Sequence, residues 1–210
     1  WIKNKKIETN FTKIILFIIS ILISYLIAKN FSTQVLYSTL IISSALFLFF
    51  VSITDLQNTK LKLSQKISHS AFSILIISII LNSLFSEEVS VNLKKGEEKK
   101  LSNYLLKFES ISKMEINNFT SLKAEIHVIE NNNKLKFHPE LRLYEVPKTI
   151  TSEADIITNL FSDNLVVVNY LKDTDYLNIR YQKKPFMLLI WLSAFMLAVG
   201  GLVGLRKNFK

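Results

Sequence analysis

The chain has 210 residues, no cysteine and a formal net charge of +9. The absence of cysteine excludes disulfides, thiolate metal sites and a haem joined to this chain through thioether bonds. Residues 87–184 hold 15 basic and 15 acidic residues, so the whole positive excess lies outside this segment. That uneven distribution is typical of membrane topology and argues against a nucleic-acid-binding surface.

In chain order, four stretches carry no charged residue: residues 14–28, 30–54, 67–86 and 185–205. An apolar run of roughly 20 residues matches the ~30 Å hydrocarbon core of a bilayer. The shorter first run lies between Lys13 and Lys29, whose side chains can reach outward to the headgroups. Apolar side chains surround each stretch on all sides, and a soluble chain of this length could not cover four such helices. We therefore predict four transmembrane helices.

The basic residues predict how these helices cross the membrane. Ten of the 11 basic residues outside 87–184 fall in three clusters, at residues 3–13, 60–66 and 206–210. If every stretch crosses the bilayer, all three clusters lie on one side, which the positive-inside rule makes cytoplasmic. We expect residues 1–86 to form three helices, 87–184 an exported domain, and 185–210 the last helix with a basic tail. Both termini would then be cytoplasmic, and because the chain begins with Trp1, we expect a fragment or one segment of a longer protein.

The exported segment has the pattern of a small β domain. Strand-like runs rich in Val, Ile, Phe and Tyr occur at residues 88–93, 105–111, 122–129, 134–144, 165–171 and 176–181. Turns are predicted at residues 95–96, 131–133 and 172–175. Only residues 152–160 have a helical pattern, with Thr151 or Ser152 as the N-cap. About 100 residues in short strands predict an all-β sandwich or open barrel inserted between the last two helices.

Two histidines, His127 and His138, lie in this domain. A three-residue turn would place them on opposite faces, and a two-residue turn would place them directly opposite each other. Only the second register permits a shared metal, and no third ligand is evident. The sequence also lacks a nucleophile elbow, zinc-ligand spacing and a Gly-rich phosphate loop, so the domain is predicted to be a binding surface.

Within the predicted helices, His69 is the only histidine, and an ionisable residue inside a membrane span is a functional candidate. Neutral imidazole is a common axial ligand of haem iron, although an interfacial histidine bonded to a headgroup is the alternative. Gly200, Gly201 and Gly204 lie in the last helix. Gly200 and Gly204 form a small-xxx-small pair, which lets two membrane helices approach closely.

Four motifs over roughly residues 65–210 resemble the C-terminal part of the CcmF family of membrane haem lyase subunits. They are SHS at 68–70, VNLKKGE at 91–97, HPELRLY at 138–144 with TSEADI at 151–156, and YQKKPF at 181–186 followed by IWL and a Gly-Gly pair. The third motif is similar to the family's HPEKRxY, and the fourth to its YYKPF ending. The chain departs from the family at Ser70-Ala71, where Leu-Gly is usual, and at Met187, where an Arg is usual.

This resemblance implies a function in cytochrome c maturation in the bacterial inner membrane, with residues 87–184 in the periplasm. It implies a b-type haem (haem b) whose axial ligand in this chain is His69 and whose second ligand lies in a missing N-terminal part. The implied partners are that N-terminal part, a haem chaperone, apocytochrome c and other maturation subunits. The resemblance implies part of a haem lyase that attaches haem to apocytochrome c, and without the N-terminal haem-handling region the chain is not expected to be active alone.

Two other readings remain open. The chain could be a membrane-tethered interaction module whose β domain docks a partner without binding haem. It could also be a ResB-like cytochrome assembly protein, which combines membrane spans with an exported β domain. The motifs at 138–144 and 181–192 argue against this last reading.

Overall fold

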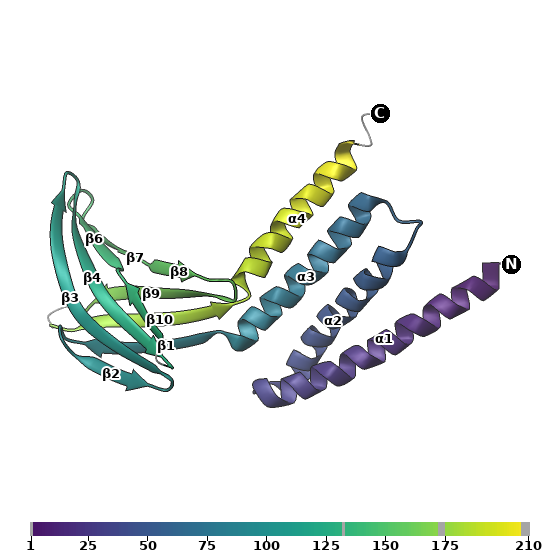
Figure 1. Cartoon of the computed structure of the whole chain (residues 1–210), viewed down its shortest axis with the longest axis horizontal. Helices are drawn as coiled ribbons and strands as arrows, with labels where there is room; N and C mark the ends of the chain where they lie inside the picture. Colours follow the sequence, from purple (N-terminus) through teal and green to yellow (C-terminus); the bar gives the residue numbers. More distant parts are fainter. Residues whose placement is uncertain (1, 132, 172–174, 207–210) are drawn as a thin grey trace. The chain divides into compact units, whose positions relative to one another are not determined.

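The computed structural model describes residues 2–131, 133–171 and 175–206, and the chain divides into two compact units (Figure 1). The helical unit comprises the chain up to Phe85 and from Phe186 onward. The β unit comprises Ser86–Pro185. The β unit is therefore an insertion between two helices of the other unit.

Four helices are described in the helical unit: α1 (Ile2–Phe31), α2 (Val35–Gln57), α3 (Leu63–Phe85) and α4 (Met187–Arg206). Each contains a segment long and apolar enough to cross a membrane: Phe11–Phe31, Val35–Gln57, Leu63–Phe85 and Met187–Leu205. Long runs of Leu, Ile and Phe without Pro favour uninterrupted helices in an apolar solvent, because every interior backbone group is bonded within the helix. The four predicted spans are confirmed as membrane-capable helices.

Small residues are among the most deeply buried in the helical unit. Ser20, Ser24 and Ala28 recur every four residues along α1 and are fully buried, whereas most large side chains of that helix are exposed. The Ser20 hydroxyl donates to the Leu16 carbonyl oxygen at 2.7 Å, so this buried hydroxyl keeps its hydrogen bond within the helix. Short side chains of this kind let helices approach closely when the surroundings are as apolar as the side chains themselves.

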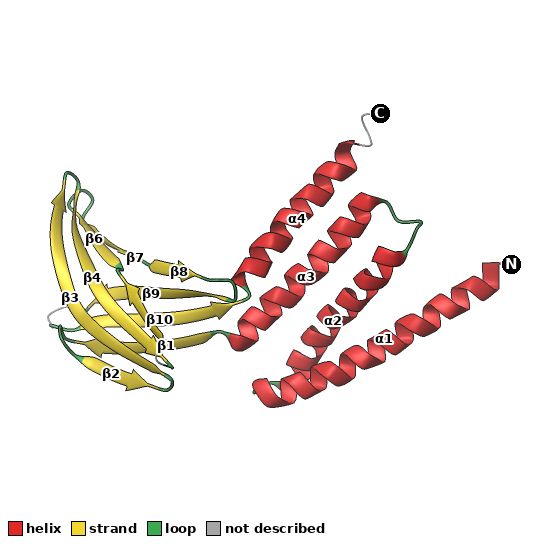
Figure 2. Cartoon of the chain, in the orientation of Figure 1, coloured by secondary structure: helices red, strands yellow, loops and turns green. Residues whose placement is uncertain are grey.

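The β unit contains ten described strands, drawn as arrows in Figure 2: β1 (Glu87–Leu93), β2 (Glu98–Leu101), β3 (Tyr104–Ile116), β4 (Phe119–Glu130), β5 (Asn133–Phe137), β6 (Glu140–Tyr144), β7 (Thr149–Glu153), β8 (Asp155–Thr158), β9 (Ser162–Tyr170) and β10 (Leu177–Pro185). They form two antiparallel sheets. One has the order β1-β10-β9-β8, and the other has the order β2-β3-β4-β6-β7 with β5 also paired to β4. The predicted all-β fold is confirmed, in its sandwich form.

Alternating side chains from both sheets build the core of this sandwich. The buried apolar residues are Val91, Leu93, Tyr104, Leu106, Phe108, Ala124, Ile126, Val128, Phe137, Leu141, Val166, Val168, Leu177, Ile179 and Tyr181. Along β3 and β9 every second residue is buried over the part of the strand that faces the other sheet. This period of two is what a pleated strand with one covered face requires.

Two secondary-structure predictions were wrong. Residues 152–160 are not a helix: 152–153 end β7, 155–158 form β8, and 159–160 lie in the turn that follows. The Ser152 hydroxyl, expected to cap a helix, instead donates to the Val168 carbonyl oxygen at 2.5 Å, and Ser152 pairs with Leu141 of β6. Pairing with a neighbouring strand satisfies the backbone of this β-branched segment, and that tertiary contact overrides the local capping pattern.

The run 134–144 is not one strand but two, because residues 138–139 interrupt it. Proline has no N–H to donate to a ladder, so the strand breaks beside Pro139. The short strand β2 was not predicted. The predicted turn at 172–175 lies largely outside the described residues, whereas the one near 131 is present, with Asn131 at φ +46°.

Candidate functional site

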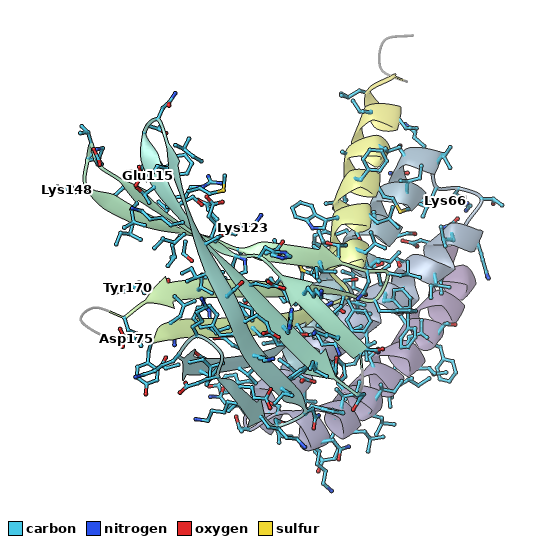
Figure 3. The ribbon with its side chains drawn as sticks, turned by 60° about the vertical axis from the view of Figure 1, so that its left-hand side comes forward. Lys66, Glu115, Lys123, Lys148, Tyr170 and Asp175 are labelled. Carbon is cyan, nitrogen blue, oxygen red and sulfur yellow. The ribbon has the colours of Figure 1, made fainter. Side chains whose placement is uncertain are left out.

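His69 and Asp55 are brought together by a tight connection between α2 and α3. The helix α2 ends at Gln57, and the next five residues reverse the chain before α3 begins at Leu63. The turn is held by the Asn58 side chain, which accepts a hydrogen bond from the Lys60 N–H at 3.0 Å. Lys66, labelled in Figure 3, donates from Nζ to the Leu56 carbonyl oxygen at 2.7 Å and satisfies one of the last carbonyls of α2.

The contact between the two side chains selects the tautomer of the neutral histidine ring. His69 Nδ1 lies 3.0 Å from Asp55 Oδ2, with side-chain exposures of 51% and 25%. A carboxylate can only accept, so the proton of a neutral ring must be on Nδ1 and the lone pair on Nε2. No hydrogen bond to His69 Nε2 comes from the part of the chain that the structure describes. The Nε2 lone pair of the ring is therefore free to bind a metal ion.

This pair lies at an apolar groove of about 430 Å³ within the helical unit. The lining side chains come from α2, α3 and α4: Leu48, Val51, Ser52, Asp55, Ser68, His69, Phe72 and Leu197. Four of the eight, Leu48, Val51, Phe72 and Leu197, are hydrocarbon side chains. An apolar groove with a few convergent polar groups is the usual form of a binding site for a cofactor or small ligand.

A serine pair holds α2 and α3 together beside the groove. Ser52 Oγ and Ser73 Oγ are 2.8 Å apart and both side chains are buried. Each hydroxyl has a single hydrogen, so one serine donates to the other. The accepting serine then donates to a carbonyl oxygen of its own helix, that of Phe49 for Ser52 or that of Ser70 for Ser73, each at 2.9 Å. Interhelical hydroxyl contacts of this kind contribute about 0.6 kcal/mol each in membrane helices. They orient the two helices that supply Asp55 and His69.

The glycines of α4 differ in what surrounds them. A Cβ on Gly200 would overlap the Ser68 hydroxyl and lie 3.2 Å from the Ser68 backbone nitrogen, so α4 meets α3 at backbone distance beside His69. A Cβ on Gly204 would lie 3.7 Å from Ser64 Cβ. At Gly201 a Cβ would meet nothing within 4 Å among the described residues, so a packing role for Gly201 stays a prediction.

Asp55 is the residue that sequence analysis missed. It is the only acidic residue between Glu8 and Glu87, and it lies in the last turn of a helix, where a negative charge opposes the helix dipole. An isolated carboxylate at the end of an apolar span needs a hydrogen-bond donor, and the His69 ring on the returning helix supplies one. That pairing could have been predicted from the antiparallel arrangement of the two spans.

The histidines of the β unit do not meet. The observed register places His127 opposite Lys136, which is neither of the two registers considered, and β5 ends before His138. The His127 side chain is only 6% exposed and lies between two carboxylates. Its Nε2 is 3.1 Å from Glu125 Oε1, and its Nδ1 is 3.0 Å from Glu109 Oε1 without the geometry of a hydrogen bond. The ring thus has a carboxylate on either side, and no metal-binding group of three ligands is found among the described residues.

The motif at 138–144 has a structural role. The Arg142 guanidinium donates from Nε and Nη2 to the two carboxylate oxygens of Glu140, and it covers the ring of Phe119 at 5.2 Å. The arginine and a hydrogen bond from Ser121 hold the pKa of Glu140 below its usual range. The Asp155 carboxylate accepts a hydrogen bond from the His138 N–H at 2.6 Å. The motifs at 138–144 and 151–156 therefore support each other across neighbouring strands.

Comparison with known proteins agrees with this architecture. Residues 84–185 match the family described as "CcmF C-terminal beta-sandwich". The cytochrome c-type biogenesis protein CcmF of Pseudomonas fluorescens is 30% identical over 140 residues, which cover 66% of this chain and 21% of that protein. The probable cytochrome c-type biogenesis protein NrfE of Escherichia coli is 22% identical over 71% of this chain and 27% of its own length.

A solved structure described as cytochrome c haem lyase CcmF has the same fold, with a TM-score of 0.65 and 11% sequence identity. The similarity covers 90% of this chain and 33% of that one. The chain spans about a fifth to a quarter of the length of the curated relatives that it matches. The resemblance seen in the sequence motifs is thus confirmed: the chain belongs to the CcmF family of cytochrome c-type biogenesis proteins, of which it has the C-terminal β-sandwich.

Proposed function

We propose that this chain is the C-terminal segment of a haem lyase subunit in cytochrome c maturation. In this proposal it helps to hold a b-type haem in the membrane and to deliver and attach haem to apocytochrome c. The observation that carries the proposal is the hydrogen bond between Asp55 and His69 Nδ1 at the edge of an apolar groove.

The residues at the groove fit a haem. A neutral imidazole nitrogen is a standard axial ligand, and the Asp55 carboxylate accepts a hydrogen bond from the opposite ring nitrogen, which orients the ring. Leu48, Val51 and Phe72 supply an apolar lining suited to a porphyrin face. When bound, the haem supplies one-electron redox chemistry. His69 is the only histidine in the sequence of the four helices, so we expect the second axial ligand from another part of the protein.

The remaining parts of this chain would support that site. Gly200 allows α4 to lie against Ser68, the residue before His69, and so closes one side of the groove. In this proposal, Asp55 and the Ser52–Ser73 pair set the orientation of the imidazole before any ligand binds. Because the ring is already oriented, less conformational entropy is lost when a ligand binds.

The partners and the placement in the cell are part of the proposal. We expect the β unit to face the periplasm of the bacterial inner membrane and both termini to be cytoplasmic, because the basic clusters lie outside the β unit. Reporter fusions within residues 87–184 and after residue 210 measure this directly. A haem chaperone, apocytochrome c, the N-terminal part of the same protein and other maturation subunits are the expected partners.

The experiment that tests the haem assignment is a His69→Ala substitution. The protein is expressed from its native gene, together with any coding sequence that precedes the codon for Trp1. It is purified in detergent, and its reduced-minus-oxidised absorbance spectrum is recorded. We expect the b-haem absorbance to be lost in His69→Ala and retained in His127→Ala and His138→Ala. Undiminished absorbance in His69→Ala would reject the assignment and favour a membrane-tethered module that docks a partner through its β unit.

A further inference from the structure

The turn between β8 and β9 combines two features that rarely occur together. It is held rigidly, because the Asn159 side chain accepts hydrogen bonds from the N–H groups of Phe161 at 3.0 Å and Ser162 at 2.8 Å. It also presents two adjacent large apolar side chains, with Leu160 69% and Phe161 79% exposed. Turns of this kind normally carry small polar residues, whereas this rigid turn displays a Leu and a Phe that the described residues of the β unit leave exposed.

Strand register locates this turn next to the point where the chain leaves the β unit. Ser162 pairs with Pro185, and Pro185 is only two residues before Met187, the first residue of α4. The other end of the inserted unit is close by, because Glu87, at the start of β1, pairs with Lys183. The segment Met187–Leu205 is apolar enough to cross a membrane. The turn therefore lies at the end of the sandwich where the chain passes into a membrane-capable helix.

The other described turns at this end are polar. The turn between β2 and β3 carries Ser102 and Asn103 before Tyr104, whose hydroxyl donates to Glu87. The turn between β4 and β5 includes Asn131 and follows Glu130, which pairs with Lys183 Nζ at 2.8 Å. The apolar character thus belongs to one turn and is not a general property of this end of the sheet.

We propose that Leu160 and Phe161 insert into the interfacial region of the lipid bilayer beside the start of α4 and anchor the sandwich to the membrane surface. The occupant is lipid, because the pairing of Ser162 with Pro185 places these side chains within a few residues of the bilayer boundary of the last span. Large apolar side chains close to a span gain by leaving water for the acyl boundary, whereas the polar turns beside them do not. This anchor is independent of whether the chain binds haem.

The test uses the absence of cysteine in the chain. Single variants Leu160→Cys and Phe161→Cys are labelled with a nitroxide in the full chain, reconstituted in phosphatidylcholine vesicles. The matched control is Val146→Cys, on a turn with a 92% exposed apolar residue at the opposite end of the sandwich. In Figure 3 that end is marked by Glu115 and Lys148, which lie close to each other.

We expect labels at 160 and 161 to be relaxed by dissolved oxygen and protected from a water-soluble nickel complex, and the label at 146 to show the reverse. Access of nickel at 161 equal to that at 146 would place the turn in water and overturn the proposal. Protection from both reagents would mean that protein covers the turn, and this result would also overturn the proposal. As an independent readout, the fluorescence of a Phe161→Trp variant should be quenched by brominated lipid more strongly than that of Val146→Trp. Trp1 and Trp191 are present in both variants and give the same background.

Discussion

The two units of this chain use apolar residues in opposite ways. In the helical unit many large side chains are exposed, and the buried ones are small, such as Ser24, Ala28 and Ala71, with Ile42 as an exception. In the β unit the buried side chains are large, such as Tyr104, Phe137 and Tyr181, and the outer faces carry paired charges. A unit surrounded by lipid gains little by hiding leucine and is held by close backbone contact, whereas a unit surrounded by water gains from every apolar side chain that it buries.

The comparison predicts that removing volume damages the β unit most. Phe137 is fully buried and meets the Tyr181 ring edge-to-face at a centroid distance of 6.2 Å. Phe137→Ala should lower the free energy of unfolding of the β unit by about 3–5 kcal/mol, through lost transfer energy and the cavity that remains. The measurement is the urea midpoint of the β-sheet circular dichroism signal in the full chain. The exposed Ile150→Ala is the control and should change little, and equal losses in the two variants would contradict the core assignment.

The same comparison predicts that adding volume damages the helical unit. Gly200→Leu should destabilise the packing of α4 on α3 by about 1–3 kcal/mol, because its side chain must displace Ser68. Insertion into the membrane should be unaffected, since leucine partitions well into lipid. The measurement is thermal stability in detergent.

Gly201→Leu adds the same side chain one residue away, where the described residues leave open space, and should be neutral. Two equally unstable variants would mean that the helix itself, and not its contact with Ser68, is sensitive to leucine. Two equally stable variants would mean that α4 does not meet α3 at Gly200.

The polar pair in the helical unit should affect binding more than folding. Asp55→Ala removes the carboxylate that holds His69 Nδ1 and should weaken haem binding about 10–100-fold, as loss of such outer partners usually does. Thermal stability should fall much less, because both side chains are partly exposed. Haem titration of the protein in detergent measures the first effect. Asp55→Glu should restore part of the affinity, and an unaffected affinity in Asp55→Ala would show that the hydrogen bond does not serve the site.

The smallest expected effect is the response of the β unit to acid. The hydrogen bond from His127 holds the pKa of Glu125 below its usual range, and Lys107 with His127 does the same for Glu109. A carboxyl whose pKa is depressed in the folded state contributes stability above its unfolded pKa of about 4.3, and this is lost as pH falls through the folded value. The urea midpoint should therefore fall slightly between about pH 6 and about pH 3.5.

Glu125→Gln should make that fall shallower, and Glu145→Gln, on an exposed turn, serves as the matched control. An identical pH dependence in the wild type and in Glu125→Gln would remove this ion-paired cluster as a contributor.

The sequence predicted those features that depend on local composition. The four helices follow from long charge-free runs, and most strands follow from alternating β-branched and aromatic residues. What failed depends on contacts between distant segments: residues 152–158 became strands because β6 and β9 lie beside them, and the pairing of His127 with Glu109 and Glu125 depends on the irregular pairing near Phe108. Only half of the candidate site was predicted from the sequence. His69 was predicted because it is a histidine within an apolar span, whereas the role of Asp55 depends on the antiparallel arrangement of α2 and α3.

The pairing of β1 with β10 has a consequence for synthesis. β1 is an edge strand whose neighbour in the described sheet is β10, so the first strand of the inserted unit joins its sheet only through the last. Some 90 residues of chain separate the two strands, and closing so long a loop is slow. Until Leu177–Pro185 has been made, β1 is an open template for wrong partners. The order of translation thus makes this sandwich depend on its final strand, and a chain truncated before Leu177 should leave β1 unpaired.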